Sequence, residues 1–251
     1  MDMSIYHAAA ALNATTRWQE MIAQNIAASA VPGFKQQELS FAGIQAGQLS
    51  VAGSGLPATP VILPSLTEHT SMSQGELRYT GVPTNVALEG QGFFEVQLPN
   101  GDNAYTRDGE FHVDAQGQLV TKQGYPVLGG GRPIQLDPNN PAPVSISSDG
   151  EVSQGADSKG RITVTDFNDP QRLRVAGNGL YLAQDPNLHA IPATDARLHQ
   201  GYTEAGNISP VVAMGEMIDA MRHFEANQRV LQIQDERLGR VIGDLGNTSP
   251  N

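Results

Sequence analysis

Apolar residues near the C-terminus recur at alternating steps of three and four residues, from Met214 to Leu245. This spacing places them along one narrow side of an α-helix, as in a coiled-coil seam, and such a seam requires a partner. Gln228 and Asp235 interrupt it, and polar residues there either set the register of pairing or are simply tolerated. The apolar seam positions are Met214, Met217, Met221, Phe224, Leu231, Leu238, Ile242 and Leu245.

The sequence also marks where this helix begins. Ser209 is a good N-cap, and Pro210 suits the first helical position. A helix from Pro210 to about residue 245 would be ~54 Å long at ~1.5 Å per residue. A partner of comparable length is therefore needed to cover its seam.

A second helix is predicted over residues 3 to about 28, where four alanines at 8–11 favour helical structure. It should end before Pro32, because proline disfavours helical backbone at the preceding residue, and Gly33 permits a tight turn. Small and polar residues make its seam weaker than the C-terminal one. Its apolar seam positions are Ile5, Leu12, Ile22 and Ile26. We expect the two terminal helices to pair.

Between residues 80 and 203, apolar and polar residues alternate in short runs that end at turn signals such as Asp149-Gly150. This pattern predicts short antiparallel strands in a hairpin-rich, barrel-like domain. Phe93 and Phe94 are neighbours in one such run, so their rings should point to opposite faces. One ring is expected in the β core, and the other contacts either the same chain or another subunit.

Residues 42–74 are rich in Gly, Ala, Ser, Pro and Thr. They predict either an extended connector with one short strand at Val61–Leu63 or a flexible loop. The whole chain therefore reads as an α+β fold, with the terminal helices paired as a coiled-coil inner domain. The expected parts are an N-terminal helix at 1–35, an extended connector at 36–79, a β-rich outer domain at 80–203 and a C-terminal helix at 204–251.

Composition narrows the possible functions. The 251-residue chain has a net charge of −11 and no basic cluster, so we expect no nucleic-acid partner. It has no cysteine, which excludes disulfides and thiolate metal sites. Asp2 stands where a cleaved signal peptide would have Lys or Arg, so no ordinary leader is expected. No apolar run approaches a membrane span, so membrane insertion is not expected.

The sequence marks no catalytic, cofactor or metal site. Its glycine-rich stretches, "VAGSGLP" and "LGGGRP", fit neither a phosphate loop nor a nucleophile elbow. The histidines do not have the spacing of a metal site. They are His7, His69, His112, His189, His199 and His223. We therefore predict a protein that is not an enzyme and uses no cofactor.

Three blocks of this sequence resemble the flagellar basal-body rod and hook proteins. The first is "AQNIAASAVPGFK", in which Asn25, Pro32, Gly33, Phe34 and Lys35 match; the family often has a second asparagine where Ala28 stands. The second spans residues 88–129, where the matching residues are Gly90, Gly92, Phe93, Phe94, Tyr105, Thr106, Arg107, Gly109 and Phe111. In the third, near the C-terminus, they are Asn207, Ser209, Pro210, Met217, Phe224, Glu225 and Asn227.

This resemblance implies a structural subunit of the basal-body rod. In the family, the terminal helices pair as an inner domain, the β domain lies outside, and copies stack helically into a hollow axial tube that transmits torque to the hook. Subunits are exported unfolded through the flagellar type III apparatus, which agrees with the missing leader. The implied partners are other rod proteins, copies of the same chain and, in transit, the export apparatus.

The opening "MDMSIYHAAAALNATT" and a length near 250 are most similar to the proximal rod proteins of that family. One alternative is a distal rod or hook-like protein, since these share all three blocks. The other, from a different class, is a secreted cell-wall-binding or wall-cleaving β protein with a helical oligomerisation tail. Carboxylate pairs for glycoside cleavage meet only in three dimensions, so the sequence leaves that alternative open.

A pair of long helices without a second layer of core is marginal in an isolated chain, because helix stability comes mostly from tertiary packing. We expect the purified monomer at micromolar concentration to show β structure, with much less helix than about 60 helical residues would give. Circular dichroism measures this directly. A spectrum of full helicity would contradict the prediction that assembly orders the helices.

Overall fold

The computed structural model describes residues 3–49 and 59–247. The chain divides into two compact units. The first holds the described parts of residues 1–26, 37–69 and 210–251, and the second holds residues 27–36 and 70–209. The chain therefore passes between the units four times, after residues 26, 36, 69 and 209.

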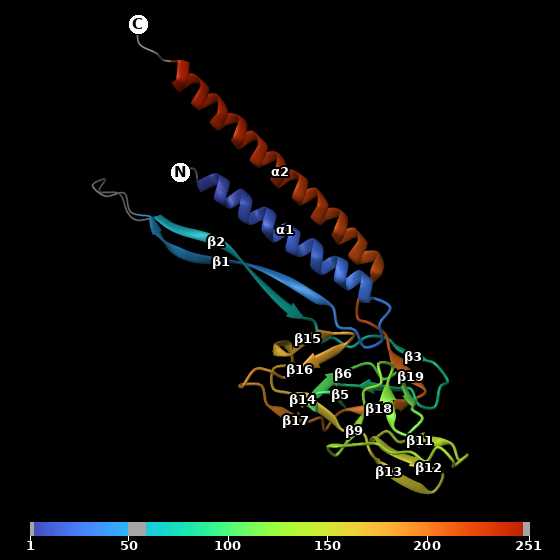
Figure 1. Ribbon diagram of the computed structural model, residues 1–251. Coiled ribbons are helices and arrows are strands. Elements are labelled where there is room, and N and C mark those ends of the chain that lie inside the picture. The colour runs from blue at the N-terminus through green and yellow to red at the C-terminus, as the bar shows by residue number, and fades with distance from the viewer. Residues whose placement is uncertain (1–2, 50–58, 248–251) are drawn as a thin grey trace. The chain divides into compact units, whose positions relative to one another are not determined.

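Two helices form much of the first unit: α1 (Met3–Ala28) and α2 (Pro210–Asn247). Both begin where the sequence predicted, and both end within two residues of the predicted position. Within this unit they lie side by side and run in opposite directions (Figure 1), and the rings of Trp18 and His223 meet at a centroid distance of 6.0 Å. The predicted contact between the terminal helices is thus present, although this contact alone does not make a coiled coil.

The covered side of α2 is close to the predicted seam but turned by one residue. Met214 and Met221 are 55% and 52% exposed, whereas Ala213 and Ala220 beside them are buried. Small side chains allow a neighbouring element to approach the helix closely, which favours the alanines on the covered side. The covered positions recur at steps of four and three residues. They are Ala213, Met217, Ala220, Phe224, Asn227, Leu231 and Gln234.

On α1, the buried side follows the predicted seam in part. Ile22 is 1% exposed, and Leu12 and Ile26 are half-buried. Leu238, near the C-terminal end of α2, is 36% exposed. Ile5, Ile242 and Leu245 lie in the helices, but their side chains are outside the described part of the structure.

The segment expected to be a connector forms two strands of the first unit. These are β1 (Gln37–Leu49) and β2 (Thr59–Thr70), which pair in a two-stranded sheet. Val61–Leu63, predicted as an isolated short strand, lies inside β2. The sequence understates this sheet because its small and polar residues show no clear alternation, which is the usual sign of a strand.

The second unit consists mainly of short antiparallel strands. Its elements are β3 (Leu77–Tyr79), β4 (Val86–Glu89), β5 (Phe93–Gln97), β6 (Asn103–Thr106), β7 (Phe111–Val113), β8 (Leu119–Thr121), β9 (Leu128–Gly129), β10 (Arg132–Pro133), β11 (Val144–Ile146), β12 (Glu151–Gln154), β13 (Asp157–Arg161), β14 (Val164–Phe167), η1 (Pro170–Arg172), β15 (Arg174–Gly177), β16 (Leu180–Leu182), β17 (Ala190–Pro192), β18 (Arg197–Gln200) and β19 (Tyr202–Glu204).

The largest sheet has six strands in the order β15-β16-β6-β5-β14-β17, and its two edge strands do not pair with each other. The predicted barrel is therefore wrong for the described residues, because the remaining strands form separate sheets of two or three. The α+β class is confirmed.

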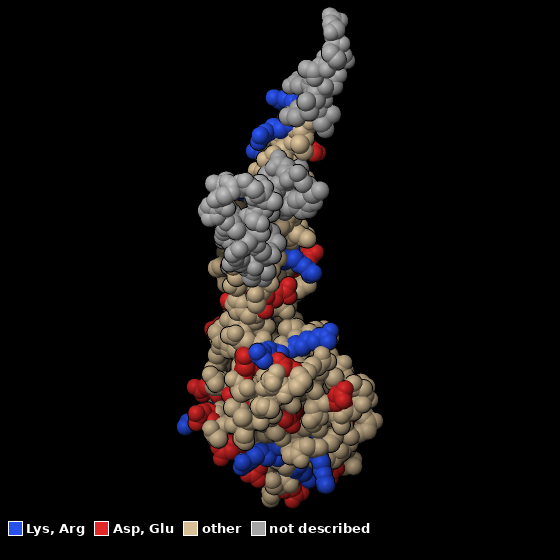
Figure 2. Space-filling model, turned by 90° about the vertical axis from the view of Figure 1, so that its left-hand side faces the viewer, with Lys and Arg blue, Asp and Glu red and all other residues tan. Residues whose placement is uncertain are grey.

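Acidic and basic side chains are interspersed on the face of this unit that Figure 2 shows, without a basic patch of the kind nucleic-acid binding uses.

The core of the second unit lies on both faces of β5. Phe94 is fully buried in a large cluster that includes Val86, Leu119 and Leu180, and it meets the Phe111 ring edge-on at 5.2 Å. Phe93, 2% exposed, belongs to a second cluster on the other face and packs against Tyr181 at 5.5 Å. Both adjacent rings are thus buried within the chain, on opposite faces of β5, so the second ring contacts the same chain and not another subunit.

Replacing Phe94 with alanine should destabilise the second unit by about 3–5 kcal/mol, since the buried ring leaves a cavity. The matched control is Tyr79→Ala, at a position 73% exposed, which should cost less than about 1 kcal/mol. Urea unfolding followed by near-ultraviolet circular dichroism compares the two. Equal losses would contradict this description of the core.

Candidate functional site

The described residues contain no cluster of His, Cys, Asp and Glu that could hold a metal ion. Two histidine–carboxylate pairs occur in the described part of the chain, His69–Glu38 and His199–Glu89, and both are partly exposed. Among the described residues, no helix is long and apolar enough to cross a membrane. The most unusual polar site is instead a network of buried charges inside the second unit.

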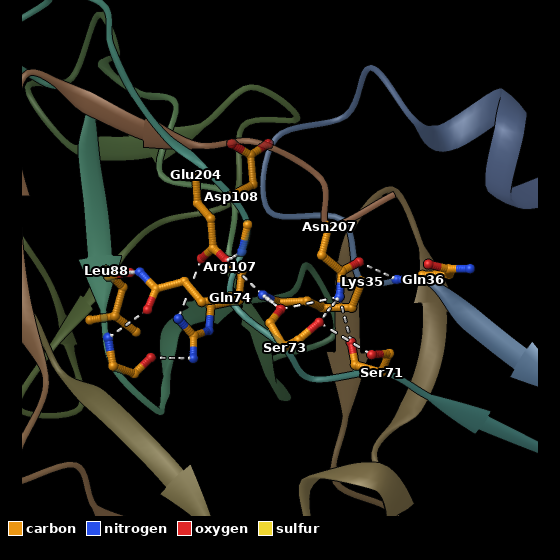
Figure 3. A network of polar contacts seen from close by, with 12 residues as sticks. Lys35, Gln36, Ser71, Ser73, Gln74, Leu88, Arg107, Asp108, Glu204 and Asn207 are labelled. Carbon is orange, nitrogen blue, oxygen red and sulfur yellow. Dashed lines mark hydrogen bonds and ion pairs between the residues drawn. The ribbon is translucent and has the colours of Figure 1, made fainter. Parts of the chain in front are cut away.

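This network centres on Glu204, at the end of β19, which is fully buried (Figure 3). Its Oε1 accepts hydrogen bonds from Lys35 Nζ at 2.6 Å and from the Gly75 backbone N–H at 2.8 Å. Its Oε2 accepts a bond from Arg107 Nη1 at 3.3 Å. One carboxylate therefore faces two cations, and such charge-assisted bonds are stronger than neutral ones.

The two cations make further contacts that fix their positions. Lys35 Nζ also donates to the Ser73 carbonyl at 2.8 Å. Arg107 donates from Nη2 to the Gly90 carbonyl at 2.7 Å and lies over the Phe93 ring at 5.3 Å. Burial lowers the pKa of both cationic side chains, and the Glu204 carboxylate opposes that shift in each case. Removal of Glu204 would leave two buried positive charges without an anion.

Asn207 extends the network to neighbouring backbone. Its Oδ1 accepts from the Gln36 N–H at 2.7 Å, and its Nδ2 donates to the Ser71 carbonyl at 2.8 Å and to the Ser73 hydroxyl at 2.9 Å. We call these residues the Glu204 network. Its members are Lys35, Gln36, Ser71, Ser73, Gly75, Arg107, Glu204 and Asn207.

The turn before Lys35 requires glycine at position 33, for two reasons. Gly33 has φ +66°, and a Cβ there would lie 2.3 Å from the Arg107 carbonyl carbon. Its N–H donates to the Glu204 backbone carbonyl at 2.7 Å. No other residue could bring the chain this close, so Gly33 allows Lys35 to reach Glu204.

The N-terminal and central family blocks, apart from Asn25, thus meet in this unit. Phe34 is buried, and its carbonyl accepts from the Asn207 N–H at 3.2 Å. Gly109 lies so close to the Val86 carbonyl that an added Cβ would be 1.7 Å from that oxygen. Gly92 precedes β5, and Tyr105 and Thr106 lie in β6.

The remaining motif residues lie elsewhere. Asn25 belongs to the first unit, where it joins the end of α1 to the start of β1: it donates to the Gln37 carbonyl at 2.8 Å and accepts from the Gln37 N–H at 3.0 Å. Asn227 is half-buried on α2, and Ser209 and Pro210 are exposed where that helix begins. These residues therefore do not form a single site.

Five members of the network were not predicted from the sequence: Gln36, Ser71, Ser73, Gly75 and Glu204. Glu204 follows a short alternating run, "GYTE", in which nothing distinguishes a buried carboxylate from an exposed one. Ser71, Ser73 and Gly75 act mainly through backbone groups, which leave no sequence signal. Lys35 and Arg107 were found only through the family resemblance.

Asp108, next to Arg107, is a second buried carboxylate that lies outside the network. It is 6% exposed, and its Oδ1 accepts from the Glu110 N–H at 2.9 Å. Burial raises the pKa of Asp108 to about 6, although this hydrogen bond acts in the opposite direction. At neutral pH the charged Asp108 carboxylate therefore lowers the stability of the folded chain.

Comparison with known proteins gives two family matches. Residues 87–154 match the model of the flagellar hook protein FlgE/F/G D1 domain. Residues 199–243 match the model of the flagellar basal body rod FlgEFG protein C-terminal region. The first range includes Gly90 and Arg107, and the second includes Glu204 and Asn207. The two matched regions therefore contain the Glu204 carboxylate and one of its two cationic partners.

Similar proteins align over nearly the whole chain. The flagellar basal-body rod protein FlgF of Caulobacter vibrioides is 34% identical over 247 residues, which cover 98% of this chain and 99% of the relative. FlgF of Salmonella typhimurium is 31% identical, with 96% and 97% covered. The rod protein FlgG of Borreliella burgdorferi is 32% identical, with 95% and 97% covered. These relatives give no support to a wall-cleaving protein.

The pH dependence of Asp108 can be tested with Asp108→Asn, which keeps the acceptor for Glu110. Because the folded pKa is about 6 and the ordinary value 3.8, the folded chain binds more protons between these values, and stability rises as pH falls through 6. At pH 7.5 the variant should be more stable than the wild type by at most about 3 kcal/mol, and the difference should vanish near pH 4.

Thermal unfolding at several pH values measures this difference. The control is Asp195→Asn, at an exposed position, which should change stability little at any pH. A wild-type protein that is the more stable of the pair at pH 7.5 would contradict the assigned shift.

Proposed function

The chain belongs to the family of flagellar basal-body rod proteins, and we propose that it enters the rod by packing α2 against the helices of neighbouring subunits. Membership of this family makes it a structural subunit of the flagellar basal body rather than an enzyme. It also implies assembly with other rod components.

An exposed apolar stripe on α2 supports this proposal. Val211, Met214, Ile218 and Met221 are 80%, 55%, 53% and 52% exposed. They recur at steps of three, four and three residues, so they lie on one side of the helix, next to the covered side. We call them the α2 stripe. Four large apolar side chains in a row, left in water, are typical of a surface that another protein covers.

The energetics favour covering the stripe in an assembly rather than in a simple dimer. Full burial of the four side chains contributes about 6–12 kcal/mol at about 1.5–3 kcal/mol each, while association of two molecules costs about 4–15 kcal/mol in lost freedom of motion. One stripe is therefore a weak interface by itself. A subunit held by several neighbours loses its translational and rotational freedom only once, while each contact with a neighbour adds to the free energy of binding.

The partners of the stripe follow from its geometry. Contacts between different faces of identical subunits build closed rings when the rotation between neighbours closes and open helical filaments when it does not, and an elongated rod is of the second kind. We therefore propose that copies of this chain pack helically, α2 stripe against another helical face of the next subunit. In such a rod, torque passes from subunit to subunit through packed helices.

Two further aspects of the resemblance belong to this proposal. The similarity of the opening segment and the length near 250 favour a place in the proximal rod. Export in an unfolded form through the flagellar type III apparatus is supported by the absence of cysteines, which could cross-link in transit. We propose that the terminal helices become ordered after export, when neighbouring subunits cover them.

The test is Ile218→Glu in cells that lack the native gene. The side chain is exposed in the monomer, so the variant should fold and be exported normally, but a charge buried in the assembled interface has no partner. Motility in soft agar should fall to that of the deletion strain, and purified basal bodies should lack the subunit.

The matched control is Val230→Glu. Val230 is 46% exposed and lies twelve residues further along α2, about 120° around the helix from Ile218. It should retain motility. Motile cells with Ile218→Glu, or equal loss with both variants, would contradict a contact through the α2 stripe.

A further inference from the structure

The Glu204 network joins all the chain segments that connect the two units. The chain passes between the units after residues 26, 36, 69 and 209. On the side of the second unit, these passages belong to three segments, residues 27–36, 70–75 and 204–209. Each of them contributes to the network: Lys35 and Gln36 from the first, Ser71, Ser73 and Gly75 from the second, and Glu204 and Asn207 from the third.

Within the second unit the three segments are bound to one another, not only to the β core. Lys35 bonds to Glu204 and to the Ser73 carbonyl, and the Ser71 N–H donates to the Gln36 carbonyl at 2.8 Å. Glu204 accepts from Gly75. Each segment therefore has bonds to both of the others.

Arg107 anchors this triple connection to the β-rich body. It bonds to Glu204 through one nitrogen of the guanidinium and to the Gly90 carbonyl through another, and it lies over the Phe93 ring of β5. Phe93 in turn belongs to the second buried cluster. Force on any one segment can therefore pass through Glu204 and Arg107 into the central sheet.

We infer that the Glu204 network is a mechanical clamp, which shares force among the three connecting segments. Force that travels along the chain from the first unit can enter the second only through these segments. Rupture requires Lys35 and Glu204 to separate while both are fully buried, and separated buried charges are strongly unfavourable. The inference rests on the proposed function for its use, because a rod that transmits torque needs subunits whose parts stay connected under load.

Single-molecule pulling on the isolated chain tests the clamp. The chain has no cysteine, so two introduced cysteines are the only attachment points. One pair, Glu20→Cys with Ala156→Cys, places a handle on α1 and another on the second unit. The other pair, Ala115→Cys with Ala156→Cys, places both handles on exposed positions of the second unit.

The variants are Lys35→Met, which removes one charge of the network, and Asn207→Ala, a milder change if the first folds poorly. Lys122→Met is the matched control, since that lysine is 75% exposed and lies 3.9 Å from its partner Glu110. Through the Glu20 handle, Lys35→Met should lower the rupture force by about a third or more and release the first segment before the rest of the unit unfolds.

The internal pair of handles distinguishes a clamp from a merely stabilising network. With those handles, Lys35→Met and Asn207→Ala should lower the force proportionately less, and Lys122→Met should leave it unchanged in both geometries. An equal proportional loss in both geometries, or no loss through the Glu20 handle, overturns the inference. The measurement uses a monomer, so it does not depend on the α2 stripe: Ile218→Glu should leave these forces unchanged.

Discussion

The buried contact between Glu204 and two cations is the interaction on which the rest of this molecule depends. A carboxylate without access to water is unfavourable unless its bonds are complete, and here Lys35, Arg107 and the Gly75 N–H complete them. These groups come from sequence positions up to 169 residues apart. The contact therefore forms only when the beginning, middle and end of the β-rich unit have come together.

The amino-acid sequence was sufficient to locate both helices and the strand around Phe94, since each has a clear period of buried side chains. It was not sufficient for β1 and β2, whose small and polar residues leave no such period. The covered side of α2 was misplaced by one residue at some positions because the seam was assigned from the spacing of the large apolar residues. Ala213 and Ala220 are buried instead, as close packing against a helix favours small side chains.

The buried network was harder to foresee than the fold. Family resemblance pointed to Gly33, Lys35 and Arg107, but gave no reason for them. The reason lies in contacts that no local pattern encodes: a glycine that approaches the Arg107 backbone, and a glutamate that looks exposed in its own strand. Long-range charge pairing has no periodicity, so a single sequence cannot reveal it.

The two units differ in how much of their apolar surface is buried within the chain, and this difference bears on function. The second unit buries both faces of β5 and pairs its buried Glu204 with two cations of the same unit. In the first unit, the described part of α2 leaves Val211, Met214, Ile218 and Met221 in water. A subunit built this way can fold one part alone and reserve the other for assembly. If α2 holds the subunit in the rod, as proposed, the β-rich unit must follow the helices, and this requires a strong connection between the two units. Three segments gathered on one buried carboxylate provide that connection with very few residues.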